Sequence, residues 1–111
     1  MRGVLYGGAT VWAEDAVADA LLNYAAEAAR QGRREVLRVP VRVDGADGWL
    51  GVLLTPHISI GVLQTAAAPT GSVRGSRAFL AEVGARTSSL NEDPILFGDP
   101  EVDGALSTNE D

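Results

Sequence analysis

The sequence has no cysteine and no lysine, and it has a single histidine among its 111 residues. Without cysteine, the chain can form no disulfide scaffold, no iron–sulfur centre and no thiolate zinc site, and it has no cysteine nucleophile. Without lysine, the P-loop pattern for phosphate binding cannot be completed. The dinucleotide fingerprint G-x-G-x-x-G is absent as well. We therefore predict neither a cofactor nor a metal site.

The lone histidine, His57, stands in the stretch Thr-Pro-His-Ile-Ser. Metal sites need several ligands at set spacings, which this stretch does not offer. A catalytic role with Ser59 or Ser76 would need an exposed hydroxyl beside an oriented base, and nothing in the sequence indicates either. The adjacent pair Glu14 and Asp15 does not suggest carboxyl groups that face each other across a substrate. The sequence therefore predicts no catalytic residue, and His57 is interpreted as a turn residue.

No apolar run is long enough for a transmembrane helix, and the first residues lack the pattern of a signal peptide. We therefore expect a cytoplasmic protein that does not contact a membrane. The formal charge of −6 is unevenly distributed. Residues 92–111 hold seven acidic and no basic residues, so residues 1–91 hold nine arginines against eight acidic residues. We predict one compact domain over residues 1–98, followed by a disordered acidic tail over 99–111.

Hydrophobic periodicity predicts one long helix over residues 14–31. Val17, Leu21, Tyr24 and Ala28 recur at helical spacing, and Gly32 is well placed to end the helix in a left-handed conformation. A second, short helix is expected over residues 77–85. Ser76 would be its N-cap, Gly84 its end, and its inward-facing residues would be Phe79, Leu80 and Val83.

Several stretches have the composition of strands. Residues 4–12 form a first strand, in which the pair Gly7-Gly8 suggests a bulge or a close backbone approach. Residues 35–44 alternate between apolar and polar side chains, and Pro40 favours an edge strand or a bulge there. A turn cluster then begins a hairpin, and residues 49–65 are either two strands or one long bent strand. Residues 66–76 are interpreted as a flexible loop.

This order of elements predicts an α+β fold. We expect a small two-layer sandwich with a mixed or antiparallel sheet of about four strands, one long helix and one short helix.

The densest local feature is a group of five arginines within thirteen residues: Arg30, Arg33, Arg34, Arg38 and Arg42. One interpretation is a solvated rim. The alternative is a band that accepts an anion, such as an acidic partner or the acidic tail of this chain. Nucleic acid is the partner that the charge supports least. Trp12 and Trp49 stand near strand ends and are candidate aromatic anchors, although such residues also cover the edges of small cores.

These features favour a non-catalytic domain that associates with itself, as a homodimer, or with another protein. The strand that contains Pro40 would be the natural place to pair with another chain. The alternative is a pocket for a small anionic ligand between helix 14–31 and the sheet, with Arg38 or Arg42 holding the anion. A small enzyme or enzyme subunit is a further alternative.

Overall fold

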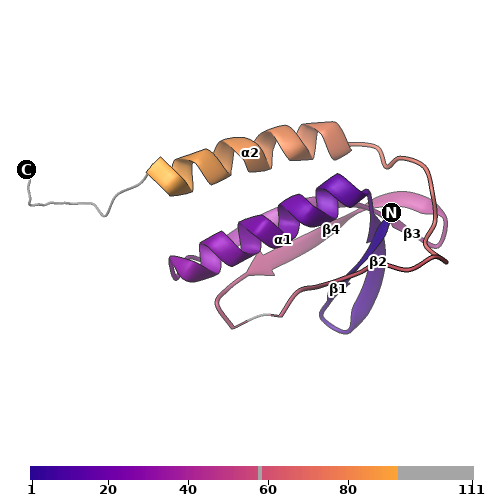
Figure 1. The fold of residues 1–111 in the computed structure, drawn as a ribbon, viewed down its shortest axis with the longest axis horizontal. Coiled ribbons are helices and arrows are strands. Elements are labelled where there is room, and N and C mark those ends of the chain that lie inside the picture. Colours follow the sequence, from indigo (N-terminus) through magenta and orange to yellow (C-terminus); the bar gives the residue numbers. More distant parts are fainter. Residues whose placement is uncertain (58, 93–111) are drawn as a thin grey trace, which may run out of the picture.

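The structure is a computed structural model that describes residues 1–57 and 59–92; the predicted tail over residues 99–111 lies outside the described residues. The elements follow in the order β1 (Arg2–Tyr6), β2 (Ala9–Ala13), α1 (Asp15–Arg30), β3 (Glu35–Val43), β4 (Ala46–Leu54), β5 (Gly61–Leu63) and α2 (Ser76–Glu92). The strands form one antiparallel sheet in the order β4-β3-β2-β1-β5 (Figure 1). This arrangement confirms the predicted α+β class.

The sheet has five strands because the first predicted strand is in fact a hairpin. Gly7 and Gly8 have φ values of 59° and 82° and form the turn between β1 and β2. Two consecutive residues with positive φ are what a two-residue hairpin turn requires, and glycine adopts this conformation without strain. The single strand predicted over residues 4–12 was therefore wrong.

The second hairpin, between β3 and β4, has the turn residues Asp44 and Gly45, with φ values of 51° and 79°. Leu37, Val39 and Val41 of β3 are buried, as the alternation predicted. They belong to one core with buried side chains of β1, β2, β4 and both helices.

Pro40 does not mark an edge strand, since β3 pairs with β4 on one side and with β2 on the other. In a two-residue hairpin the residue pairs alternate, and Pro40, opposite Trp49, is at a position without hydrogen bonds to β4. The missing N–H of Pro40 therefore affects only the side toward β2. The register between β2 and β3 consists of the single pair Trp12–Arg42. Proline thus shortens this pairing, and the prediction of an edge was wrong.

Residues 49–65 contain two separate strands, which settles the question that the sequence left open. β4 and β5 lie at opposite edges of the sheet, yet only residues 55–60 connect them. The hydroxyl group of Tyr6, on β1, hydrogen-bonds to the backbone of Leu53 on β4, so the sheet curls enough to bring the end of β1 close to the β4 edge.

The long helix α1 has the buried face that its periodicity predicted: Val17, Leu21, Tyr24 and Ala28 are all buried, together with Ala18. It ends as expected at Gly32, whose φ is 67°. The N–H groups of Gly32 and Arg33 donate to the carbonyl oxygens of Ala29 and Ala28, at 3.0 and 2.9 Å. These two bonds form the Schellman motif of a helix that ends in a left-handed glycine.

The second helix is not short. α2 runs from Ser76 to Glu92 and passes through Gly84, where we predicted its end. Burial of Phe79 and Val83 holds its first turns, and Arg86 ties a later turn to β3 by donating to the carbonyl oxygen of Val36. Such tertiary contacts outweigh the modest cost of one glycine in a helix. Figure 1 shows α1 and α2 running side by side in the same direction. No helix in the described residues is long and apolar enough to cross a membrane.

Candidate functional site

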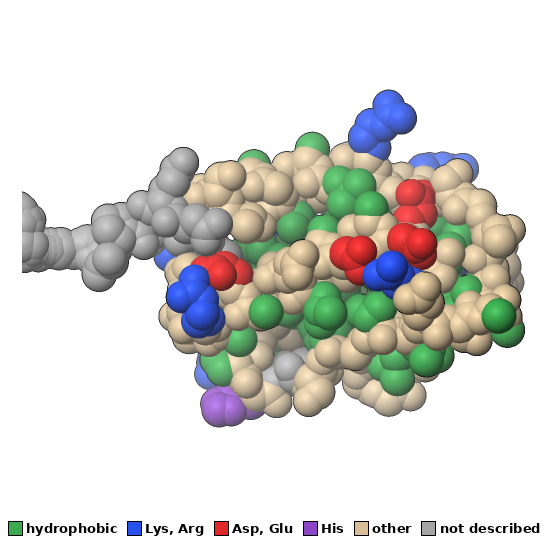
Figure 2. Space-filling model, in the orientation of Figure 1, with side chains coloured by type: hydrophobic (Ala, Val, Ile, Leu, Met, Phe, Trp, Pro, Cys, Tyr) green, Lys and Arg blue, Asp and Glu red, His purple; other side chains and the backbone are tan. Residues whose placement is uncertain are grey.

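His57 lies on an exposed turn between β4 and β5, and Figure 2 shows the histidine side chain, in purple, at the surface. Its backbone N–H donates to the hydroxyl group of Thr55 at 3.2 Å. Ser76, one of the two candidate nucleophiles, is buried at the start of α2, where its hydroxyl group donates to the carbonyl oxygen of Val73. Within the described residues, no three His, Asp or Glu side chains lie close enough together to hold a metal ion.

The five clustered arginines occupy two separate places. Arg30, Arg33 and Arg34 lie at and after the end of α1, where Arg30 pairs with Glu27. Arg38 and Arg42 belong to β3. The guanidinium carbon of Arg38 stands 4.9 Å from the ring centroid of Trp49, a cation–π contact.

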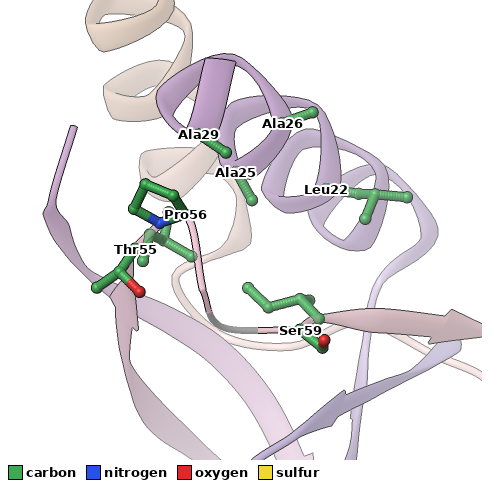
Figure 3. Close-up of a pocket in the computed structure, with 9 residues that line it drawn as sticks. Leu22, Ala25, Ala26, Ala29, Thr55, Pro56 and Ser59 are labelled. Atoms are coloured by element: carbon green, nitrogen blue, oxygen red, sulfur yellow. The ribbon is translucent and has the colours of Figure 1, made fainter. Parts of the chain in front are cut away.

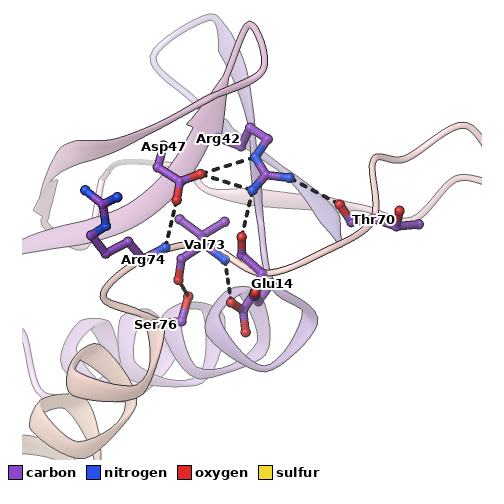
Figure 4. Close-up of polar contacts among 8 residues, drawn as sticks. Glu14, Arg42, Asp47, Thr70, Val73, Arg74 and Ser76 are labelled. Atoms are coloured by element: carbon purple, nitrogen blue, oxygen red, sulfur yellow. Dashed lines mark hydrogen bonds and ion pairs between the residues drawn. The ribbon is translucent and has the colours of Figure 1, made fainter.

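Arg42 is committed to contacts within the chain (Figure 4). Its guanidinium group donates to the carbonyl oxygens of Thr70 and Ser72, at 3.1 and 2.7 Å, and to the carboxylate of Asp47 at 3.0 Å. Asp47 also accepts the backbone N–H of Arg74 at 3.0 Å. The N–H of Arg74 and the guanidinium group of Arg42 hold the pKa of Asp47 below its ordinary value.

A third anchor of this loop comes from the start of α1. The carboxylate of Glu14 accepts the backbone N–H of Val73 at 2.6 Å, and the Val73 side chain is buried. Residues 66–76, predicted to be a flexible loop, are therefore attached at several points to the sheet and to α1. No sequence pattern predicts these contacts, because each joins residues that are far apart along the chain.

Of the two candidate aromatic anchors, Trp12 is half-buried on β2, opposite Arg42. Trp49 on β4 is 52% exposed. A Cβ atom at Gly75 would lie 2.7 Å from the ring of Trp49, so the ring packs directly on the backbone before α2. Only Trp49 therefore offers a large aromatic surface to a partner.

Side chains that alternate with the core-facing ones form the face of the sheet turned away from α1, which we call the outer face. Five large apolar residues on this face are between 41% and 64% exposed: Leu5, Val36, Trp49, Leu53 and Leu63. Val36 and Leu53 are cross-strand partners on β3 and β4. Exposed apolar side chains that gather on one face are typical of interaction surfaces, whereas scattered ones are ordinary.

A hollow of about 300 Å3 lies between α1 and the connection from β4 to β5 (Figure 3). Its walls are mostly apolar, and they comprise Leu22, Ala25, Ala26, Ala29, Leu54, Thr55, Pro56, Ser59 and Ile60. The predicted pocket was placed between this helix and the sheet, whereas this hollow is lined by the helix and mainly by the connection that follows β4. The lining contains neither Arg38 nor Arg42, so the chemistry of the walls suits an apolar occupant rather than an anion.

A second hollow, also of about 300 Å3, involves Tyr24, Arg33, Glu35 and Arg86. Burial raises the pKa of the Tyr24 hydroxyl group, and its hydrogen bond with the carboxylate of Glu35 raises it further. Arg86 forms ion pairs with Glu82 at 2.8 Å and with Glu35 at 3.8 Å. The sequence placed Tyr24 on the buried face of the helix, but it did not indicate that Glu35 and Arg86 lie beside it. These groups largely satisfy one another, which indicates a structural role.

No family model, no curated protein sequence and no solved structure matches this chain. Arg42, Asp47 and the loop groups that bond to them form what we call the Arg42 cluster, and a loop of the chain itself already occupies it. The outer face around Trp49 and the apolar hollow beside α1 are accessible.

Proposed function

We propose that this chain is a non-catalytic association domain and that it forms a homodimer through the β4 side of its outer face. The observation that supports this proposal most is the exposure of Trp49, Val36 and Leu53 on β3 and β4. β4 is also an edge strand of nine residues, and edge strands offer unpaired backbone groups to a second chain. A symmetric partner that pairs along this edge would extend the sheet and bring the exposed side chains of the two β4 strands side by side.

The oligomeric state of the full chain tests this proposal. We expect a dimer in sedimentation velocity and in size-exclusion chromatography with light scattering, with dissociation on dilution. Trp49→Asp should give a folded monomer, since a charge would be introduced into the buried contact. Leu63→Asp is the matched control, because Leu63 is similarly exposed on the outer face but belongs to the opposite edge strand. A wild-type chain that stays monomeric at every concentration would overturn the proposal, and so would dissociation by Leu63→Asp alone.

The hollow beside α1 supports a second candidate function, the binding of a small apolar molecule. Its volume is at the lower end of the range for ligand pockets, and its lining is largely alanine and leucine. Toluene is a suitable probe. Binding would shift the backbone amide resonances of Ala25 and Ile60, and Ala25→Leu would abolish the shifts by filling the hollow. Shifts of equal size around Val43, which lies at the β3–β4 hairpin turn and outside the lining, would indicate non-specific binding instead.

A further inference from the structure

Along β4, a short run of backbone N–H and C=O groups lies in the plane of the sheet and points away from β3, toward the free edge. In an antiparallel pair, residues alternate between positions that bond to the partner strand and positions that face outward. The two-residue turn at Asp44 and Gly45 sets this alternation, because the flanking pair Val43–Ala46 closes the turn. The N–H and C=O groups of residues 47, 49, 51 and 53 therefore face outward from β4.

Contacts elsewhere agree with this assignment. The outward groups of Leu53 are bonded to the Tyr6 hydroxyl group, and the corresponding outward carbonyl of Val36 on β3 accepts from Arg86. Within the described residues, no hydrogen bond is made by the outward backbone groups of Asp47, Trp49 and Gly51. The unpaired run is therefore bounded by the hairpin turn at one end and by Tyr6 at the other.

We infer that β4 pairs with β4 of a second copy in antiparallel orientation, about a two-fold axis that passes beside Trp49. This inference rests on the proposed self-association and specifies how it is made. In this register Trp49 faces the partner's Trp49, and Asp47 faces the partner's Gly51. The whole unpaired run is then bonded, and the two sheets become one.

The position of Tyr6 selects this register. If the partner strand were shifted by two residues toward the end of β4, the backbone groups of Leu53 would have to bond to the partner. The Tyr6 hydroxyl group already bonds to them. A shift in the other direction would leave Gly51 opposite the turn residue Gly45 and so lose a bonded pair. Centring on Trp49 satisfies every free group and disturbs no existing bond.

Charge and size indicate a second copy as the occupant. On the outer face, Gly51 has no side chain, and its neighbour across the pair with β3 is Arg38. The carboxylate of Asp47 is already bonded by Arg42 and by the N–H of Arg74, so the partner's Arg38, beside the partner's Gly51, adds a longer-range attraction that the symmetry makes twice. The pairing brings no like charges opposite each other, and it places two aromatic rings in contact at the axis.

The first test removes one outward N–H. Gly51→Pro eliminates this donor, and proline is tolerated on an edge strand where the N–H faces solvent. Gly51→Ala keeps the N–H, and its Cβ atom would meet nothing within 4 Å, so it is the matched control. We expect Gly51→Pro to raise the dimer dissociation constant roughly tenfold or more, through two lost hydrogen bonds and the bulk of the ring, while Gly51→Ala leaves it nearly unchanged.

The second test uses the absence of cysteine from the chain. Residues that face each other at a bonded pair have Cα atoms about 5.5 Å apart, within the span of a disulfide. Trp49→Cys should therefore form a symmetric intermolecular disulfide under mild oxidation, whereas Leu63→Cys should not.

The outcomes separate this inference from the proposed function. A monomeric wild-type chain overturns both. A wild-type dimer that Gly51→Pro does not weaken relative to Gly51→Ala overturns the β4 pairing and leaves self-association standing. Trp49→Cys also removes the aromatic ring and can weaken the dimer for that reason. If this variant does not dimerise, the comparison of Gly51→Pro with Gly51→Ala decides whether β4 pairs with β4. A dimer that cross-links through Leu63→Cys instead would assign the contact to the other edge.

Discussion

The hydroxyl group of Tyr6 accepts a hydrogen bond from the backbone N–H of Leu53 at 2.9 Å and donates one to the carbonyl oxygen of the same residue at 3.3 Å. These two residues lie on β1 and β4, which β2 and β3 separate in the strand order. One side chain thus joins the end of the first hairpin to the far edge of the second. It also blocks the last part of that edge, which limits where another strand can pair.

Replacing this hydroxyl group tests its contribution to stability. Tyr6→Phe removes both bonds but keeps the ring in contact with the core. We expect the free energy of unfolding to fall by about 1 kcal/mol, the usual net value for such bonds when water can reach the freed groups. Urea unfolding monitored by circular dichroism measures the change. Thr10→Val removes a hydroxyl group from the same hairpin and is the control; an equal effect of both variants would contradict the assigned role of Tyr6.

The local elements were largely predictable because short-range patterns determine them. The buried face of α1, its end at Gly32 and the inward side chains of β3 all follow from periodicity and turn chemistry. Two predictions were wrong because glycine is compatible with more than one local structure. The pair Gly7-Gly8 can form a bulge or a turn, and Gly84 can end a helix or lie within it.

Gly84 provides a direct test of which outcome is correct. In the structure Gly84 lies inside α2 without a positive φ, and a Cβ atom there would meet nothing within 4 Å. Gly84→Ala should therefore stabilise the fold by about 0.5–1 kcal/mol, because alanine loses less conformational entropy in a helix. If the helix ended at residue 84 in a left-handed conformation, the same substitution would destabilise. The sign of the change in the urea midpoint separates the two possibilities.

The contacts of the Arg42 cluster could not be predicted, because sequence periodicity says nothing about pairs such as Arg42 with Ser72 or Glu14 with Val73. For the arginine cluster, the sequence left two interpretations open, a solvated rim and a band that accepts an anion. The structure instead brings Asp47 and carbonyl oxygens of the chain to Arg42, and these acceptors come from a distant loop. The lining of the apolar hollow was not predictable either, because residues 55–60 meet α1 only through the course of the connection between β4 and β5.

The pKa of Asp47 makes the attachment of this loop sensitive to acid. Because its pKa in the folded chain is depressed below the ordinary value of 3.8, Asp47 contributes stability that is fully present above that value. The contribution is lost as the pH falls through the lower, folded-state pKa. Asp47→Asn should therefore flatten the loss of stability between about pH 5 and pH 2 in a series of urea unfolding curves. Asp44→Asn makes the same charge change on the same hairpin, and a matching flattening there would contradict the role of Asp47.

Two separate constraints favour glycine at position 75, and a double-mutant cycle can separate their contributions to the free energy of unfolding. Its φ of 91° is unfavourable for any residue with a side chain, and a Cβ atom would lie 2.7 Å from the ring of Trp49. Gly75→Ala should cost roughly 2 kcal/mol or more of unfolding free energy, from backbone strain and overlap combined. In a Trp49→Ala background the overlap disappears while the strain remains, so the cost should be smaller.

The cycle is measured at one low protein concentration, so that dissociation of a dimer does not enter the comparison. The difference between the two costs is the coupling between residues 49 and 75. A positive coupling means that the ring of Trp49 rests on the backbone before α2 and therefore helps to position the start of that helix. Equal costs in the two backgrounds would assign the whole penalty to the backbone, and would leave Trp49 without a role in holding the loop.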